Sequence, residues 1–152
     1  MSKYLDDLIS ACQQAKAAEP VQQYEYHEDL SLQRHKKYLY VIEDLSGDPE
    51  ATFNAFEKYK ASGKRKCPKA NEPSTVMYIG SSLGGIKRRI LEHKGYGSKS
   101  TYALNLDSWF IEQPYRITIY EYAVRSQVLQ LIEDALAHDL KPAFGKRGPN
   151  SQ

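Results

Sequence analysis

The sequence predicts an α/β fold of the α+β type, in which a small three-stranded, mainly antiparallel sheet is flanked by helices. Three short runs are dense in aromatic and β-branched residues, and they alternate with stretches whose apolar residues recur at helical spacing. A chain of 152 residues is long enough to bury one core without a metal or disulfide framework. We therefore expect one domain with an N-terminal helix and a helical insert between the first two strands.

The first half of the chain is predicted to contain one strand between two helices. Residues 3–18, "KYLDDLISACQQAKAA", have apolar side chains at helical spacing and end before Pro20, which indicates an amphipathic helix. The run "KKYLYVIEDL" predicts a strand near residues 38–43. Asp48 is a typical N-cap and Pro49 suits a first helical position, so a second helix follows.

The second half is predicted to add two strands and three helices. Residues 74–80, "STVMYIG", form the second strand, and Gly84-Gly85 precedes the helix "IKRRILEHK". A loop and a short helix lead to the alternating run "YRITIYEYAV", which predicts the third strand. Ser126 is placed to cap the last helix, "QVLQLIEDALAHDL", which ends before Pro142.

Composition restricts where the protein acts. No apolar run approaches the ~18 residues that span a bilayer, and Asp6 and Asp7 lie where a signal peptide is apolar. Cys12 and Cys67 have neither metal-ligand spacing nor a disulfide framework, so unpaired thiols are expected. We therefore expect a cytoplasmic, intracellular protein without a membrane partner.

Positive charge is concentrated in the C-terminal part. Residues 1–63 carry 7 basic and 11 acidic side chains, whereas residues 64–152 carry 14 and 8, which gives net charges of −4 and +6. We divide the chain into an N-terminal helical extension (1–35) and a main domain (36–152) with an insert at 45–74. The basic part suits a polyanion, although a solvated basic surface gives the same count.

The helix "IKRRILEHK" carries a candidate pair. At 100° per residue, Arg89 and His93 lie one turn apart at the margin of the apolar stripe. Of the three consecutive cations, Arg89 is best placed to point into an interior cleft, whereas Lys87 and Arg88 lie farther round the helix. A solvated basic helix with a surface histidine is the alternative. The apolar stripe consists of Leu83, Ile86 and Ile90.

The last helix places Glu133 at the margin of its apolar stripe, whereas Asp134 faces away. A carboxylate beside a core stripe needs a cation or a metal as its partner. A metal ligand and a salt-bridged glutamate explain the pattern equally well. The stripe consists of Leu129, Ile132, Leu136 and Leu140.

Two tyrosines are candidates for a shared functional site. Tyr40 and Tyr78 lie on predicted strands that should be neighbours in the sheet. Because strand residues two apart share a face, the two phenol groups could converge on one spot. The sequence leaves the register of these strands open.

Four motifs, taken in their order along the chain, resemble those of the GIY-YIG nuclease superfamily over about residues 38–145. "YLYVI" at 38–42 and "MYIGSS" at 77–82 are similar to the two halves of its signature, and Gly80 matches the signature glycine. "IKRRILEH" is similar to the catalytic helix of the family. "QLIEDALAHDLKP" is similar to its closing helix, which carries a metal-binding glutamate.

The chain departs from the family pattern in three places. The first half reads Tyr-Leu-Tyr rather than Gly-Ile-Tyr. An insertion puts 37 residues between Tyr40 and Tyr78, which some restriction-enzyme members also show. The asparagine that usually follows the last helix would align near Gly145, and the nearest asparagine is Asn150.

The resemblance implies a GIY-YIG-like fold and a divalent-metal-dependent DNA endonuclease that hydrolyses phosphodiester bonds. In the matching positions, Tyr40 would be the general base in contact with His93. Arg89 would fork onto phosphate oxygens, and Tyr78 would donate a hydrogen bond to the phosphate. Glu133 would hold one Mg²⁺ or Mn²⁺ ion that keeps most of its waters.

The implied partner is DNA, expected to be double-stranded, and a homodimer is compatible with this function. Residues 64–77 carry four cations against the single acid Glu72 and lead directly into the Tyr78 strand, so they start close to the proposed site. A solvated loop is the alternative. The side chains expected to contact the DNA backbone are Lys64, Arg65, Lys66, Lys69, Lys87, Arg88, Lys146 and Arg147.

Two other functions stay open at this point. A module derived from such a nuclease can bind DNA with weak or no cleavage, which the absent asparagine favours. A protein-interaction domain with merely solvated basic helices is the second, and it predicts no salt-dependent affinity for DNA.

Overall fold

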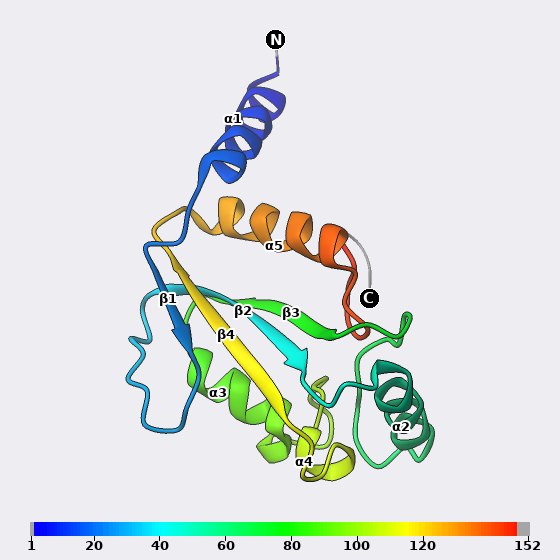
Figure 1. Cartoon of the computed structure of the whole chain (residues 1–152). Helices are drawn as coiled ribbons and strands as arrows, with labels where there is room; N and C mark the ends of the chain where they lie inside the picture. Colours follow the sequence, from blue (N-terminus) through cyan, green and yellow to red (C-terminus); the bar gives the residue numbers. More distant parts are fainter. Residues whose placement is uncertain (1, 149–152) are drawn as a thin grey trace.

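The computed structural model describes residues 2–148, and within them the chain forms an α+β domain around one antiparallel sheet (Figure 1). The strand order is β1-β4-β2-β3, with β4 and β2 in the interior of the sheet. The strands are β1 (Gln22–Glu25), β2 (Lys37–Asp44), β3 (Val76–Ser82) and β4 (Tyr115–Tyr122). The α+β class and the antiparallel sheet are therefore confirmed.

The prediction of three strands is wrong, because β1 adds an edge strand to the sheet. β1 pairs antiparallel with β4 and places Tyr24 opposite Ile119. Its sequence, "QQYE", lacks the alternation of apolar and polar residues that marks a strand, and three of its four residues are exposed. Main-chain pairing with β4 attaches this strand together with the half-buried Tyr24, whose Oη donates to Glu121 Oε1 at 3.2 Å.

The interior strand β2 buries side chains on both faces of the sheet. Tyr40 and Ile42 point to one face and Leu39 to the other, because strand residues alternate. Helix α5 (Ser126–Leu140) packs on the Leu39 face, and helix α3 (Ile86–Leu91) lies on the Tyr40 face (Figure 1). The sheet is thus the middle layer, and Tyr40 faces the helix that carries the candidate arginine.

The helices that follow Asp48 and Arg125 differ in how their N-termini are capped. Asp48 caps α2 (Pro49–Ala61) as predicted, because its Oδ1 accepts a hydrogen bond from the N–H of Ala51 at 3.1 Å. The predicted cap of α5 at Ser126 is wrong, since the N-cap is Arg125 and makes no side-chain capping bond. Packing of its apolar face, rather than a cap, holds the start of α5.

Helix α3 continues into a π-helical turn, η1 (Glu92–Tyr96), which ends at a break. Gly95 has a φ of 123°, a conformation that favours glycine. The wider turn changes the helical phase, and His93 is fully buried rather than at the margin of the stripe. Leu83 is 56% exposed, so its predicted place in that stripe is wrong, because the helix begins only at Ile86.

Two further helices complete the described chain. Helix α1 (Lys3–Ala17) extends beyond α5, and the short α4 (Leu106–Trp109) precedes β4 (Figure 1). Among the described residues, no helix has the length and apolar character needed to cross a membrane. Cys12 is exposed and Cys67 is buried, and both are free thiols, as predicted.

Candidate active site

The pairing of β2 with β3 brings the two candidate tyrosines together. Tyr40 lies opposite Gly80 and Tyr78 lies opposite Ile42, so the tyrosines are diagonal neighbours on one face. Their rings are nearly parallel, with centroids 6.2 Å apart and an interplanar angle of 14°. The register that the sequence left open is therefore one in which the two phenols share a site.

Gly80 leaves the space that the Tyr40 ring occupies. A Cβ at position 80 would lie 2.6 Å from Cζ of Tyr40 and 3.0 Å from its Cε1, well inside van der Waals contact. Tyr40 is 1% exposed, so the ring is packed on its other sides as well. A glycine at this position is thus required by the packing of the tyrosine.

We expect Gly80→Ala to lower the free energy of unfolding by about 1–3 kcal/mol, the usual cost of overpacking a core. Urea denaturation measures this loss, because the midpoint falls with stability. Ser81→Ala, on the same strand, adds no volume and is the matched control. An unchanged midpoint for Gly80→Ala would mean that the Tyr40 ring can move aside without cost.

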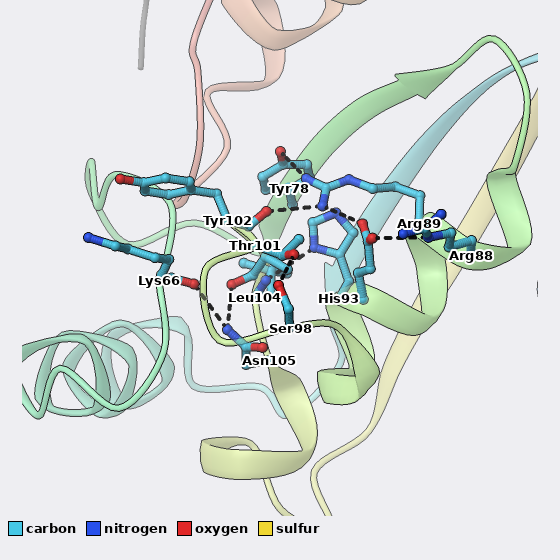
Figure 2. A network of polar contacts seen from close by, with 12 residues as sticks. Lys66, Tyr78, Arg88, Arg89, His93, Ser98, Thr101, Tyr102, Leu104 and Asn105 are labelled. Atoms are coloured by element: carbon cyan, nitrogen blue, oxygen red, sulfur yellow. Dashed lines mark hydrogen bonds and ion pairs between the residues drawn. The ribbon is translucent and has the colours of Figure 1, made fainter.

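Arg89 binds both tyrosines from α3. Its Nε donates to Tyr40 Oη at 3.2 Å, and its Nη2 donates to Tyr78 Oη at 3.2 Å. Its Nη1 donates to the main-chain oxygen of Tyr102 at 3.0 Å, as Figure 2 shows. The same Nη1 donates to Glu92 Oε1 at 3.1 Å. These four bonds leave one of the five guanidinium N–H groups, on Nη2, for a further acceptor. The arginine is therefore held rigidly with one donor to spare.

His93 is the second donor to Tyr40. Its Nε2 lies 3.0 Å from Tyr40 Oη, and its Nδ1 accepts a hydrogen bond from the N–H of Leu104 at 3.2 Å. Because Nδ1 is an acceptor, the proton of the neutral imidazole must be on Nε2. Nε2–H then donates to Tyr40. The phenol oxygen thus receives N–H bonds from both His93 and Arg89, an arrangement that stabilises a phenolate.

Burial and charge set the protonation states of this network. Burial raises the pKa of Tyr40 above its ordinary value, Tyr78 adds to the rise, and Arg89 opposes it. Burial holds the pKa of His93 well below its ordinary value, and the charge of Arg89 adds to this effect. Burial alone would lower the pKa of Arg89, but the two phenols and Glu92 raise it overall. At neutral pH the site therefore combines a neutral phenol, a neutral imidazole and a charged guanidinium.

Glu133 is buried on α5 with a lysine as its cation. Lys146 Nζ lies 2.7 Å from Glu133 Oε2 and 2.7 Å from Asp134 Oδ1. The salt-bridged alternative for Glu133 is therefore the one that this arrangement contains. The expectation that Asp134 faces away is wrong, since its side chain is only 13% exposed and shares the same ammonium. The ammonium of Lys146, a candidate DNA contact, is engaged by these two carboxylates.

These two carboxylates decide which kind of metal site fits. Glu133 and Asp134 offer oxygen donors of the kind that Mg²⁺ and Mn²⁺ prefer, and the Lys146 ammonium lies between them as a stand-in cation. Across residues 2–148, no group of three or more His, Cys, Asp or Glu side chains could hold a metal ion. Mg²⁺ commonly binds one or two carboxylates together with substrate phosphates. The pair therefore fits a cation shared with a substrate, not a cage made by the protein alone.

Asn71, which the sequence pattern did not mark, binds Gly145, the position near which the asparagine of the family would align. Asn71 Nδ2 donates to the main-chain oxygens of Gly145 at 2.9 Å and Pro142 at 3.1 Å. Its Oδ1 is buried without a partner among the described residues. A Cβ on Gly145 would lie 2.7 Å from Cε2 of Tyr78, so Asn71 fixes a segment packed against that ring. Asn150 lies outside the described residues.

Two basic grooves are linked by a hydrogen bond of Arg89. Arg89 itself lines the first groove, and its bond to the main-chain oxygen of Tyr102 connects it to the second. Lys146 and Arg147 line neither of these grooves. The other cations of the first groove are Arg34, Lys87 and Arg88. The second is lined by the candidate DNA contacts of the insert, Lys64, Arg65, Lys66 and Lys69, together with Lys60 and Lys99.

Comparisons of the chain with protein-family models, with curated proteins and with solved structures found no match.

Proposed function

We propose that the protein is an endonuclease that hydrolyses phosphodiester bonds in DNA. One observation carries this proposal: the buried oxygen of Tyr40 is bound by two N–H donors, Arg89 Nε at 3.2 Å and His93 Nε2 at 3.0 Å. A buried tyrosine that serves only packing needs one partner for its hydroxyl group. Two donors on one phenol oxygen favour its ionised form, which is the form that removes a proton from water.

Each residue of the network has a separate task in this reaction. His93 Nε2–H holds the ionised form of Tyr40, and this phenolate takes the proton from the attacking water and becomes a neutral phenol. The water oxygen bonds to phosphorus as the bond from phosphorus to the leaving oxygen breaks. Arg89 offers its remaining Nη2 N–H and its charge to a non-bridging phosphate oxygen, where negative charge grows in the transition state. Tyr78, which accepts a hydrogen bond from the same Nη2, donates a hydrogen bond from its hydroxyl group to the phosphate. The two basic grooves supply the electrostatic attraction for the DNA backbone.

Glu133 and Asp134 are the residues that would hold a divalent cation together with the substrate. An Mg²⁺ or Mn²⁺ ion bound there would supply positive charge for the phosphate and for the leaving oxygen. Lys146 must first release the carboxylates, because its ammonium is 2.7 Å from both. The metal is therefore expected to compete with the chain's own lysine.

We expect Lys146→Met to raise the affinity for Mn²⁺ by about tenfold, since it removes a cation whose repulsion of the metal is on the order of 1 kcal/mol or more. Mn²⁺ titration followed by electron paramagnetic resonance measures this without any cleavage. The variant should also melt earlier in EDTA, because two carboxylates are left close together, and Mn²⁺ should restore its stability. Lys141→Met, at an exposed position of the same tail, is the matched control. An unchanged Mn²⁺ affinity would show that the metal binds elsewhere.

A DNA-binding module without cleavage is the second candidate function. The ion pair between Lys146 and Glu133 favours this binding module, because a carboxylate that is permanently neutralised by a lysine needs no metal. Incubation of supercoiled plasmid with Mg²⁺, with Mn²⁺ and with EDTA separates the two functions. Metal-dependent nicked or linear plasmid supports the endonuclease. Salt-dependent binding of labelled DNA with intact plasmid in every metal supports the binding module instead.

A further inference from the structure

The second basic groove combines cations with an aromatic ring that the cleavage step itself does not use. We call it the insert groove, and it encloses about 670 Å³. Among its lining residues there is no acidic side chain. Its six cations are Lys60, Lys64, Arg65, Lys66, Lys69 and Lys99. Such a cluster stays together only at a cost in repulsion, which a bound polyanion removes.

The walls of the insert groove are fixed to each other by hydrogen bonds. Arg65 Nη1 donates to the main-chain oxygen of Gly97 at 2.8 Å, and the N–H of Lys66 donates to the main-chain oxygen of Lys99 at 2.9 Å. On the insert itself, Lys60 Nζ donates to the main-chain oxygen of Pro68 at 3.0 Å. The backbone of the basic insert is thus attached to residues 97–99, while the side chains of Lys64, Lys66 and Lys69 are exposed.

An aromatic ring lies in this groove and is linked to the catalytic network. The side chain of Tyr102 is 59% exposed and lines the insert groove, while its main-chain oxygen accepts a hydrogen bond from Arg89 Nη1 at 3.0 Å. Lys66 Nζ lies 6.0 Å from the centroid of the ring. In Figure 2, Lys66 and Tyr102 extend side by side, away from Arg89. The ring therefore belongs to a residue whose main-chain oxygen is bound by the arginine that would bind the scissile phosphate.

We propose that the insert groove binds an unpaired strand of DNA, with Tyr102 as the surface on which one base stacks. A cationic groove with an exposed aromatic ring is the arrangement that holds single strands, because the cations follow the phosphates and the ring takes a base. Bases inside a duplex are stacked on each other and cannot reach such a ring. The preferred substrate would then be DNA that has an unpaired segment beside the scissile phosphate. This inference rests on the proposed function.

The test compares a short labelled single strand with a duplex of the same sequence, by fluorescence anisotropy in EDTA so that no cleavage occurs. Tyr102→Ala should weaken binding of the single strand by about 5- to 30-fold, as expected for losing one base–aromatic stack, and should change duplex binding little. Tyr102→Phe keeps the ring and should bind as the native protein does. Tyr4→Ala, at an exposed position on α1, is the control for loss of a surface tyrosine. A 2-aminopurine in the strand should be quenched by the native protein and not by Tyr102→Ala.

The inference is overturned if Tyr102→Ala binds the single strand normally, or if it weakens single-strand and duplex binding equally. The two failures can be told apart. If the native protein cleaves plasmid and Tyr102→Ala binds the single strand normally, this inference is refuted and the proposal of nuclease activity stands. If Tyr102→Ala loses single-strand binding and the native protein shows no metal-dependent cleavage, the proposal for the groove is supported and the proposal of nuclease activity is refuted.

Discussion

Arg89→Ala is expected to slow single-turnover DNA cleavage by about 10²–10³-fold, the effect of removing one donor that stabilises charge in the transition state. The change removes one of the two donors to Tyr40 Oη and the donor to Tyr78 Oη. It also removes the positive charge that opposes the rise in the pKa of Tyr40. All three losses act on the chemical step, so the rate should fall far more than the affinity for DNA.

Arg88→Ala is the matched control for Arg89→Ala, because it removes the same charge from the neighbouring position of α3. Its side chain is 88% exposed and forms only a solvent-screened ion pair with Glu92, at 3.6 Å. We expect a small loss of DNA affinity and little change in rate. Arg89→Lys should be nearly as slow as Arg89→Ala, because one ammonium cannot reproduce the planar set of donors. Equal cleavage rates for Arg88→Ala and Arg89→Ala would contradict the assigned orientation of α3.

The interior of the fold could be predicted because its strands are buried. β2, which has neighbours on both sides and helices on both faces, must be aromatic and β-branched, and the run "YLYVI" shows this directly. β1 pairs with one strand only and is mostly exposed, so its polar sequence carried no signal. The sequence thus predicts the strands that burial constrains and misses the one in which only Tyr24 is partly buried.

The candidate site was predictable where its residues share an element. Helical spacing places Arg89 and His93, four residues apart, on a common side, but the full burial of His93 depends on the π-helical turn η1 that follows α3. Lys146 reaches Glu133 from the C-terminal tail, and Asn71 on the insert reaches its acceptor on Gly145 across 74 residues of chain. Their contacts depend on how the chain folds back on itself. No local pattern could have found them, although a buried glutamate did predict that some cation must be nearby.

Tyr40→Phe is expected to lower the cleavage rate by about 10³-fold, within the range for loss of a general base. The ring itself stays, so its packing against Gly80 and His93 is retained and only Oη is lost. His93 Nε2–H and Arg89 Nε–H are left without this acceptor, which should cost about 1–3 kcal/mol of stability. Tyr78→Phe is the matched control, because it also loses a phenol bound to Arg89 but not the proposed base. We expect it to be only about tenfold slower.

The pH dependence of the rate tests the same assignment without relying on one variant. Because burial raises the pKa of Tyr40 above its ordinary value of 10.0, the phenol is neutral at pH 7, and its ionised fraction grows tenfold with each pH unit. The single-turnover rate should therefore rise about tenfold per unit between about pH 7 and pH 9, in the native protein and in Tyr78→Phe. The pKa of His93 lies well below 6.5, so no break is expected near that pH. Tyr40→Phe should lose the slope. A native rate that is flat over this range, or a break near pH 6.5 that disappears in His93→Gln, would assign proton removal to a group other than Tyr40.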